Sequence, residues 1–166
     1  VHANSGRISG AEALIRWRHP EHGYVPAERI IRLTEQSGLM DVIGNWVLDE
    51  ACRQMRCWQD AGNSEWRVAV NLSGRQLGSP KLIEDVRNAL ERNDLEPSRL
   101  ILEISEGAVM RDTDNAIAVL RSVAALGVGI SIDDFGIGVS SLLHSACPPP
   151  RSRSTAPSCW RWKKAT

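Results

Sequence analysis

Residues 100–134 read LILEISEGAVMRDTDNAIAVLRSVAALGVGISIDD, and this stretch decides the fold. Apolar runs at 100–104 and 128–132 are typical of buried strands. Between them, Asp112 begins and Gly127 ends a segment with helical periodicity. A strand, a helix and a second strand within about 30 residues form one βαβ unit. The stretch therefore predicts an α/β protein with a parallel sheet.

The remaining apolar segments extend this pattern toward the N-terminus. Pro26 is expected to open one helix in its first turn, and Asp41 to be the N-cap of a longer one. Strand starts near 67, 99 and 128 are about 30 residues apart, the size of one βα unit. Besides these features, the sequence predicts a strand over 8–17, a turn over 19–23, helices ending at Gly38 and near residue 61, a strand over 67–72 and a helix after Ser79-Pro80.

The composition is that of a globular domain. The 166 residues are 42% hydrophobic and 24% charged, and 20 basic groups balance 20 acidic ones. This balance argues against a DNA-binding protein. No apolar run approaches the roughly 20 residues of a membrane span, and no secretory signal opens the sequence. We therefore expect a cytoplasmic protein; because the chain lacks an initiator Met, membrane tethering through upstream segments stays open.

The C-terminal segment departs from the βα pattern. Residues 145–166 contain five basic and no acidic residues, and three successive prolines at 148–150 exclude a helix or a central strand there. Three interpretations stay open: a linker or disordered tail, a frameshifted continuation, and a basic binding tail with two tryptophans. We therefore divide the chain into a folded part, 1–144, and a Pro/Arg/Ser-rich tail, 145–166.

Oxygen-bearing side chains lie at or near the ends of successive predicted strands. Glu12, Asn71, Glu103 and Asp133 are separated by 59, 32 and 30 residues, and Asp134 follows the last. The carboxyl ends of parallel strands meet at one edge of a sheet, where such enzymes build their sites. Carboxylates gathered there repel one another unless a hard cation such as Mg²⁺, Mn²⁺ or Ca²⁺ binds between them. Two such cations clamp a phosphodiester and activate water, so the pattern favours a metal-dependent site.

Single acidic residues are usually surface or capping groups, but two of these five stand in apolar surroundings. Glu103 lies between two apolar residues, and Asp133 follows an Ile-Ser-Ile segment. Burying a carboxylate costs free energy unless it is paired or bound to a metal. Arg16 follows Glu12 by four residues, on the same face if one strand holds both. Its guanidinium either binds a phosphate or pairs with Glu12, and spacing alone does not choose between these roles.

Five motifs, in this order, resemble those of the EAL domain family. They are Glu12-Ala13-Leu14, Ile15-Arg16-Trp17, Asn71-Leu72-Ser73, Glu103-Ile104-Ser105-Glu106 and Asp133-Asp134-Phe135-Gly136. The resemblance runs from about residue 6 to residue 143. The family comprises bacterial phosphodiesterases that linearise the second messenger cyclic di-GMP to pGpG. It implies a modified TIM (β/α)8 barrel whose first strand runs antiparallel, and a full barrel takes about 250 residues.

The resemblance also implies a role for each motif residue. It implies cyclic di-GMP as the ligand, two Mg²⁺ or Mn²⁺ ions, a homodimer formed through the loop after Asp134, and an upstream diguanylate cyclase-like or sensory domain. The metal ligands that it implies are Glu12, Asn71, Glu103, Asp133 and Asp134. The implied substrate-binding residues are Leu14 and Arg16, and Glu106 is implied to stabilise the loop at 136–141.

The sequence departs from the family pattern at both ends. The family's initial strand is missing, as are a Lys-x-Asp strand, whose lysine orients the attacking water, and a later glutamate ligand. No catalytic residue is therefore identified, since Lys163 and Lys164 lie in no such context. We expect an incomplete barrel with a disordered or irregular C-terminal tail and with little or no activity. The alternative is a degenerate, non-catalytic module that binds cyclic di-GMP or another protein.

Overall fold

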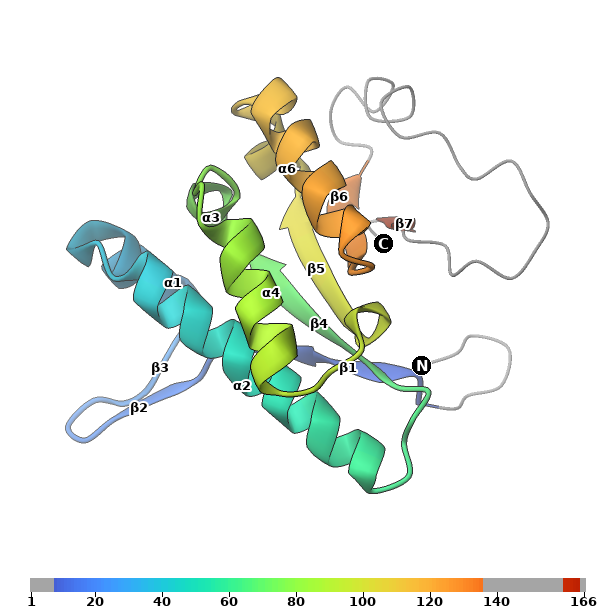
Figure 1. Cartoon of the computed structure of the whole chain (residues 1–166). Coiled ribbons are helices and arrows are strands. Elements are labelled where there is room, and N and C mark those ends of the chain that lie inside the picture. Colours follow the sequence, from blue (N-terminus) through green and yellow to red (C-terminus); the bar gives the residue numbers. More distant parts are fainter. Residues whose placement is uncertain (1–7, 136–159, 165–166) are drawn as a thin grey trace.

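The computed structural model describes residues 8–135 and 160–164, and only the backbone for 134–135 and 160–164. In this part of the chain, a five-stranded parallel sheet has the order β1-β4-β5-β6-β7, and β2 and β3 form an antiparallel hairpin (Figure 1). The strands are β1 (Gly10–Ala13), β2 (Trp17–His19), β3 (Gly23–Val25), β4 (Arg67–Leu72), β5 (Leu100–Ser105), β6 (Gly129–Phe135) and β7 (Trp160–Lys164). The helices are α1 (Ala27–Ser37), α2 (Met40–Asp60), α3 (Gly74–Leu77), α4 (Leu82–Arg92), α5 (Glu106–Met110) and α6 (Thr113–Ala125), with a 3₁₀ turn at Pro97–Arg99.

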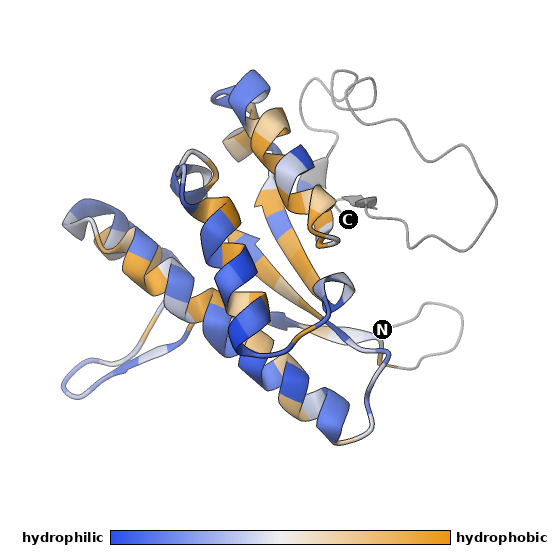
Figure 2. Ribbon diagram, viewed as in Figure 1, coloured by the Kyte–Doolittle hydropathy of each residue, from blue (hydrophilic) through white to orange (hydrophobic). Residues whose placement is uncertain are grey.

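Helices α2, α4 and α6 cover one face of the sheet (Figure 1). The side chains that meet them come from every second strand residue, because successive side chains of a strand point to opposite faces. Figure 2 shows the resulting apolar stripes along β4 and β5. The buried core includes, from the strands, Val68, Val70, Leu72, Leu100, Leu102, Ile104, Ile130 and Ile132, and from α2, Leu48, Ala51, Cys52 and Met55. The opposite face of the sheet is therefore the one available to polar side chains.

The βαβ unit that decides the fold is confirmed. β5 and β6 are parallel neighbours, and α6 connects them, as the apolar runs predict. Asp112 is the N-cap of α6, where its Oδ1 accepts a hydrogen bond from Asn115 N at 3.4 Å. The predicted end of α1 is also confirmed, since Gly38 is its C-cap with φ 73° in the left-handed region.

The predicted strand over 8–17 is wrong in its length. β1 ends at Ala13, and a new strand begins at Trp17 and pairs antiparallel with β3. In the turn between β2 and β3, His19 Nδ1 accepts hydrogen bonds from the backbone N–H groups of Glu21 at 3.1 Å and His22 at 3.3 Å. These bonds fold the chain back within a few residues. Residues 14–16 therefore connect two strands and belong to neither.

Two predicted helix starts are wrong by one or two residues. Leu39 is the N-cap of α2, and Asp41 lies inside its first turn. A carboxylate there still interacts favourably with the positive end of the helix dipole. Pro26, with φ −58° and ψ 144°, is the extended N-cap of α1 and does not lie within its first turn. Both differences leave the helices themselves where the periodicity predicts them.

The C-terminal end of the described sheet differs from the prediction in two ways. β6 continues through Phe135, so Asp133 and Asp134 lie in the strand and not in a turn after it. A strand that the sequence does not predict, β7, pairs in parallel with β6, which satisfies backbone groups that an edge strand would leave open. The loop at 136–141 and the division at residue 144 lie outside the described residues. No helix in the described part of the chain combines the length and apolarity that crossing a membrane requires.

Candidate metal and phosphate site

Glu12, Asn71, Glu103 and Asp133 lie on four consecutive strands, β1, β4, β5 and β6. The backbone register places Asn71 directly beside Glu103, Glu12 two residues below that level and Asp133 two residues above it. All four positions share the face opposite the helices, because each alternates with residues of the buried core. The outer two lie three strand spacings apart, roughly 14 Å across the sheet, and four residues apart in register, roughly 13 Å along the strands. The fold thus brings residues 59, 32 and 30 positions apart into one row along the sheet.

Glu12 and Asn71 are in direct contact across β1 and β4. Asn71 Nδ2 donates a hydrogen bond to Glu12 Oε1 at 2.6 Å. This bond fixes the orientation of the amide, because only the nitrogen end donates. Asn71 Oδ1 and the second Glu12 oxygen then remain as acceptors. Both side chains are exposed, so these oxygens are open to a ligand approaching this face of the sheet.

Glu103 and Asp133 carry carboxylates into a more enclosed part of the same face. Glu103 is only 3% exposed, and its register neighbour on β6, Ser131, is 2% exposed. Asp133 Oδ1 is buried and accepts no hydrogen bond from the described residues. A buried carboxylate oxygen without such a bond is costly unless a cation compensates its charge.

The chemistry of these donors fits a hard divalent cation. All are carboxylate or amide oxygens, the ligands that Mg²⁺ and Mn²⁺ prefer, and no thiol or imidazole belongs to the row. Among the side chains that the structure describes, no three His, Cys, Asp or Glu residues converge closely enough to surround one ion. The side chain of Asp134, the remaining predicted ligand, lies outside that description. Of the described donors, Glu12 and Asn71 are in contact, and Glu103 and Asp133 lie on neighbouring strands two residues apart in register.

Leu14 and Arg16 lie immediately beyond the carboxyl end of β1, in the segment that connects it to β2. Leu14 is 52% exposed, and Arg16 is exposed with its Nη1 donating to Ile15 O at 2.9 Å. In the described part of the chain, Arg16 forms no ion pair with Glu12. The ion pair between Arg16 and Glu12 that the spacing allows is therefore not formed. The Arg16 guanidinium is exposed beyond the end of β1, next to the row of oxygen donors that begins with Glu12.

Glu106 occupies the first turn of α5, directly after β5, and is 6% exposed. The loop that it is predicted to stabilise lies outside the described residues, so this role stays a prediction. The sequence reasoning missed a second polar group beyond the end of β4, formed by Gln76 in α3 and Ser73, the N-cap of that helix. Its signal is present in the sequence, since Ser-x-x-Gln is the pattern of a capping box.

The family model of the EAL domain matches residues 1–150. The chain belongs to the EAL domain family. Its relatives include MucR of Pseudomonas aeruginosa, a bifunctional diguanylate cyclase/cyclic di-GMP phosphodiesterase that is 54% identical over 144 residues, 87% of this chain and 21% of MucR. The cyclic di-GMP phosphodiesterase NbdA of the same organism is 44% identical over 139 residues, 84% of this chain and 18% of NbdA. The chain spans about a fifth of the length of these curated relatives.

Solved structures confirm the EAL-type α/β barrel as the fold class. The PaMucR phosphodiesterase in complex with c-di-GMP matches with a TM-score of 0.81 at 53% identity, over 86% of this chain and 58% of that one. The EAL enzyme Bd1971, bound to cAMP and cyclic di-GMP, matches with a TM-score of 0.74 at 31% identity, over 84% of this chain and 39% of that one. The open sheet described here is part of that barrel.

Proposed function

We propose that this chain carries the metal-binding side of a site that hydrolyses cyclic di-GMP to pGpG. The observation that supports it is the row of oxygen donors on β1, β4, β5 and β6, on the face of the sheet opposite the helices. Glu12, Asn71, Glu103 and Asp133 would hold Mg²⁺ or Mn²⁺, with Asp134 on the second ion. Bound there, the ions would polarise the phosphodiester and activate a water molecule.

The chain's own residues bind and orient the substrate in this proposal. Arg16, at the start of the row, would hold a phosphate through two parallel N–H donors. Leu14, exposed beside it, would contact an apolar part of the nucleotide. Two relatives whose names specify this chemistry, MucR and NbdA, are 54% and 44% identical to the chain. The complex of PaMucR with c-di-GMP supports the same ligand for this fold.

Binding should exceed turnover in this chain. In the family pattern, a lysine from a Lys-x-Asp strand orients the attacking water, and the sequence contains no Lys-x-Asp. Losing the placement of a nucleophile removes several orders of magnitude in rate. We therefore propose cyclic di-GMP binding with little hydrolysis, in the cytoplasm. The name of MucR combines both activities, which supports an upstream diguanylate cyclase-like domain as a partner of this chain. We also propose that the chain forms a homodimer through the loop after Asp134.

The experiment combines calorimetric titration with cyclic di-GMP, in the presence of Mn²⁺, and chromatography for pGpG after incubation. The expected result is saturable binding with slow or undetectable pGpG formation. Glu103→Gln should weaken binding, and Glu50→Gln, on the exposed side of α2, is the matched control that should not. Rapid release of pGpG would contradict the binding-dominated proposal. Absence of both binding and turnover in a chain that unfolds cooperatively would refute the assigned ligand.

A further inference from the structure

Helix α3 is a single turn, and it begins three residues after Asn71, the predicted ligand on β4. Ser73 is its N-cap, and Gln76 completes a reciprocal capping box. Ser73 N and Ser73 Oγ donate to Gln76 Oε1 at 3.2 and 3.0 Å, and Gln76 N donates to Ser73 Oγ at 3.3 Å. These three bonds define how the chain leaves β4. A helix this short has little stability of its own, so its position depends on its contacts.

Gln76 also packs against a glycine in the interior of α2. A methyl group at Gly44 would overlap the carboxamide nitrogen of Gln76. Glycine inside a helix costs about 1 kcal/mol relative to alanine, so a buried one needs a reason. The close approach of Gln76 supplies it. Because α2 is anchored in the core through Leu48 and Met55, the Gln76 side chain ties the turn after β4 to a rigid element.

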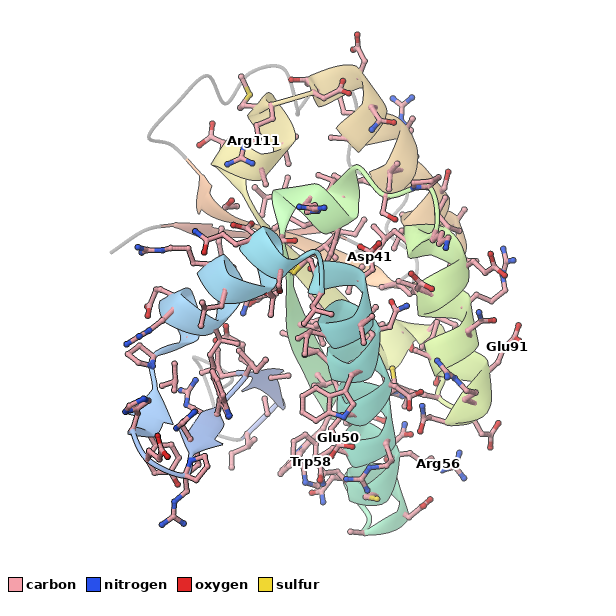
Figure 3. All side chains as sticks on the ribbon, turned by 90° about the vertical axis from the view of Figure 1, so that its left-hand side faces the viewer. Asp41, Glu50, Arg56, Trp58, Glu91 and Arg111 are labelled. Carbon is pink, nitrogen blue, oxygen red and sulfur yellow. The ribbon has the colours of Figure 1, made fainter. Side chains whose placement is uncertain are left out.

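Two further contacts hold α3 in place. Arg75 Nη1 donates to Glu35 O, in the last turn of α1, at 3.2 Å. On the other side, the position of a Cβ at Gly74 lies 3.3 Å from Ala108 Cβ of α5, the helix that follows the strand of Glu103. Figure 3 shows α3 between the first turn of α2, marked by Asp41, and α5, whose end Arg111 marks. Helix α3 is thus wedged between α2 and α5, the helix that follows the strand of Glu103.

We propose that Gln76, seated against Gly44, is a positioning residue for the Asn71–Glu12 pair. The capping box fixes the backbone two residues beyond Asn71, and the contact with Gly44 fixes the capping box. Asn71 then presents Nδ2 to Glu12 Oε1 and keeps Oδ1 for a cation. The positioning itself follows from contacts within the chain, and its consequence for metal binding rests on the proposed function.

The test compares Gly44→Ala, Gln76→Ala, their combination and Gln76→Glu. Gly107→Ala is the matched control, because a Cβ at Gly107 meets nothing within 4 Å although it also lies in a helix. The first readout is the side-chain amide signal of Asn71 in a ¹⁵N spectrum, which reports its position without metal or substrate. The second is the affinity for Mn²⁺. Thermal unfolding establishes that each variant is folded.

The proposal predicts that Gly44→Ala and Gln76→Ala both shift the Asn71 amide signal and weaken Mn²⁺ binding by about tenfold or more, as for other outer-shell partners of metal ligands. The double variant should be no worse than Gln76→Ala, because the added methyl acts only by displacing Gln76. Gln76→Glu retains the acceptor of the capping box and should resemble the wild type. If Gly44→Ala does not fold, Gln76→Ala and Gln76→Glu still carry the test.

An unchanged Asn71 signal and unchanged Mn²⁺ affinity in folded Gln76→Ala would overturn the inference. So would a double variant in which the two losses add. A different pattern refutes only the proposed function: the Asn71 signal moves as expected, but the wild type binds neither Mn²⁺ nor cyclic di-GMP. In that case Gln76 positions Asn71, and the row serves another purpose.

Discussion

Replacing Glu103 with Gln tests the cation site through its effect on stability. The side chain is 3% exposed and lies beside Asn71 and Ser131 in the register. The substitution keeps its size and removes its charge. Each protein is compared with itself with and without divalent cations, so the effect of the substitution on the cation-free protein cancels. With cations, the wild type should gain stability that the variant lacks.

The size of this gain follows from binding linkage. A cation that binds only the native state, at a hundred times its dissociation constant, adds about 2.7 kcal/mol to the free energy of unfolding. For a domain of this size, 1 kcal/mol shifts the unfolding midpoint by about 2–4 °C, so the expected rise is roughly 5–11 °C. The assay is thermal unfolding in EDTA and in saturating MnCl₂. Glu50→Gln, which removes an exposed ion pair with Arg53, should keep the full rise. An equal rise in Glu103→Gln would refute the assignment of this carboxylate as a ligand.

Three further predictions concern the fold. Burial, reinforced by the charge of Asp49, raises the pKa of Cys52 from 9.0 to about 12. The free energy of unfolding should therefore fall as pH rises from about 9 toward 12, because the unfolded thiol ionises first. A Cys52→Ala variant whose free energy of unfolding falls with pH as steeply as that of the wild type would contradict this. Gly38→Ala forces a side chain into the left-handed region at φ 73° and should cost about 1–2 kcal/mol in urea unfolding, whereas an unchanged midpoint would rule out strain at this cap. Leu102→Ala removes a fully buried side chain and should cost about 2–5 kcal/mol, checked by the same titration; a loss below 1 kcal/mol would mean that β5 is not the centre of the core.

The elements that the sequence predicts well are those with a long apolar pattern. β4, β5 and α6 have continuous apolar runs or periodic faces with glycine or a capping residue at their ends. The βα spacing then fixes the order of the strands and the face on which Asn71 and Glu103 lie. Alternation predicts the shared face of these two residues, and the pairing register of β4 with β5 then places them side by side.

The elements that were missed are short or depend on distant partners. α3 and α5 have four and five residues, too few to show a helical period of apolar residues. Their only signal in the sequence is the serine that caps the N-terminus of each. The strand that begins at Trp17 pairs with β3 and not with β4, and the apolar pattern of residues 8–17 does not reveal this change of partner. β7 exists through its pairing with β6, and no local propensity in a proline-rich context predicts it. The contact between Gly44 and Gln76 joins residues 32 positions apart, so only the packing of α2 on α3 reveals it.

The most direct test of the oxygen row is paramagnetic broadening by Mn²⁺ in a backbone amide spectrum of the isotope-labelled chain. Broadening falls off steeply with distance from the ion, so it maps the bound cation onto the strands. We expect substoichiometric Mn²⁺ to remove the signals of Glu12, Asn71, Glu103 and Asp133 first, and those of Arg67 and Leu100, toward the other end of β4 and β5, only at higher Mn²⁺ concentration. Broadening that begins at the exposed acidic residues of α2, such as Asp60, or that spares the row altogether, would contradict it.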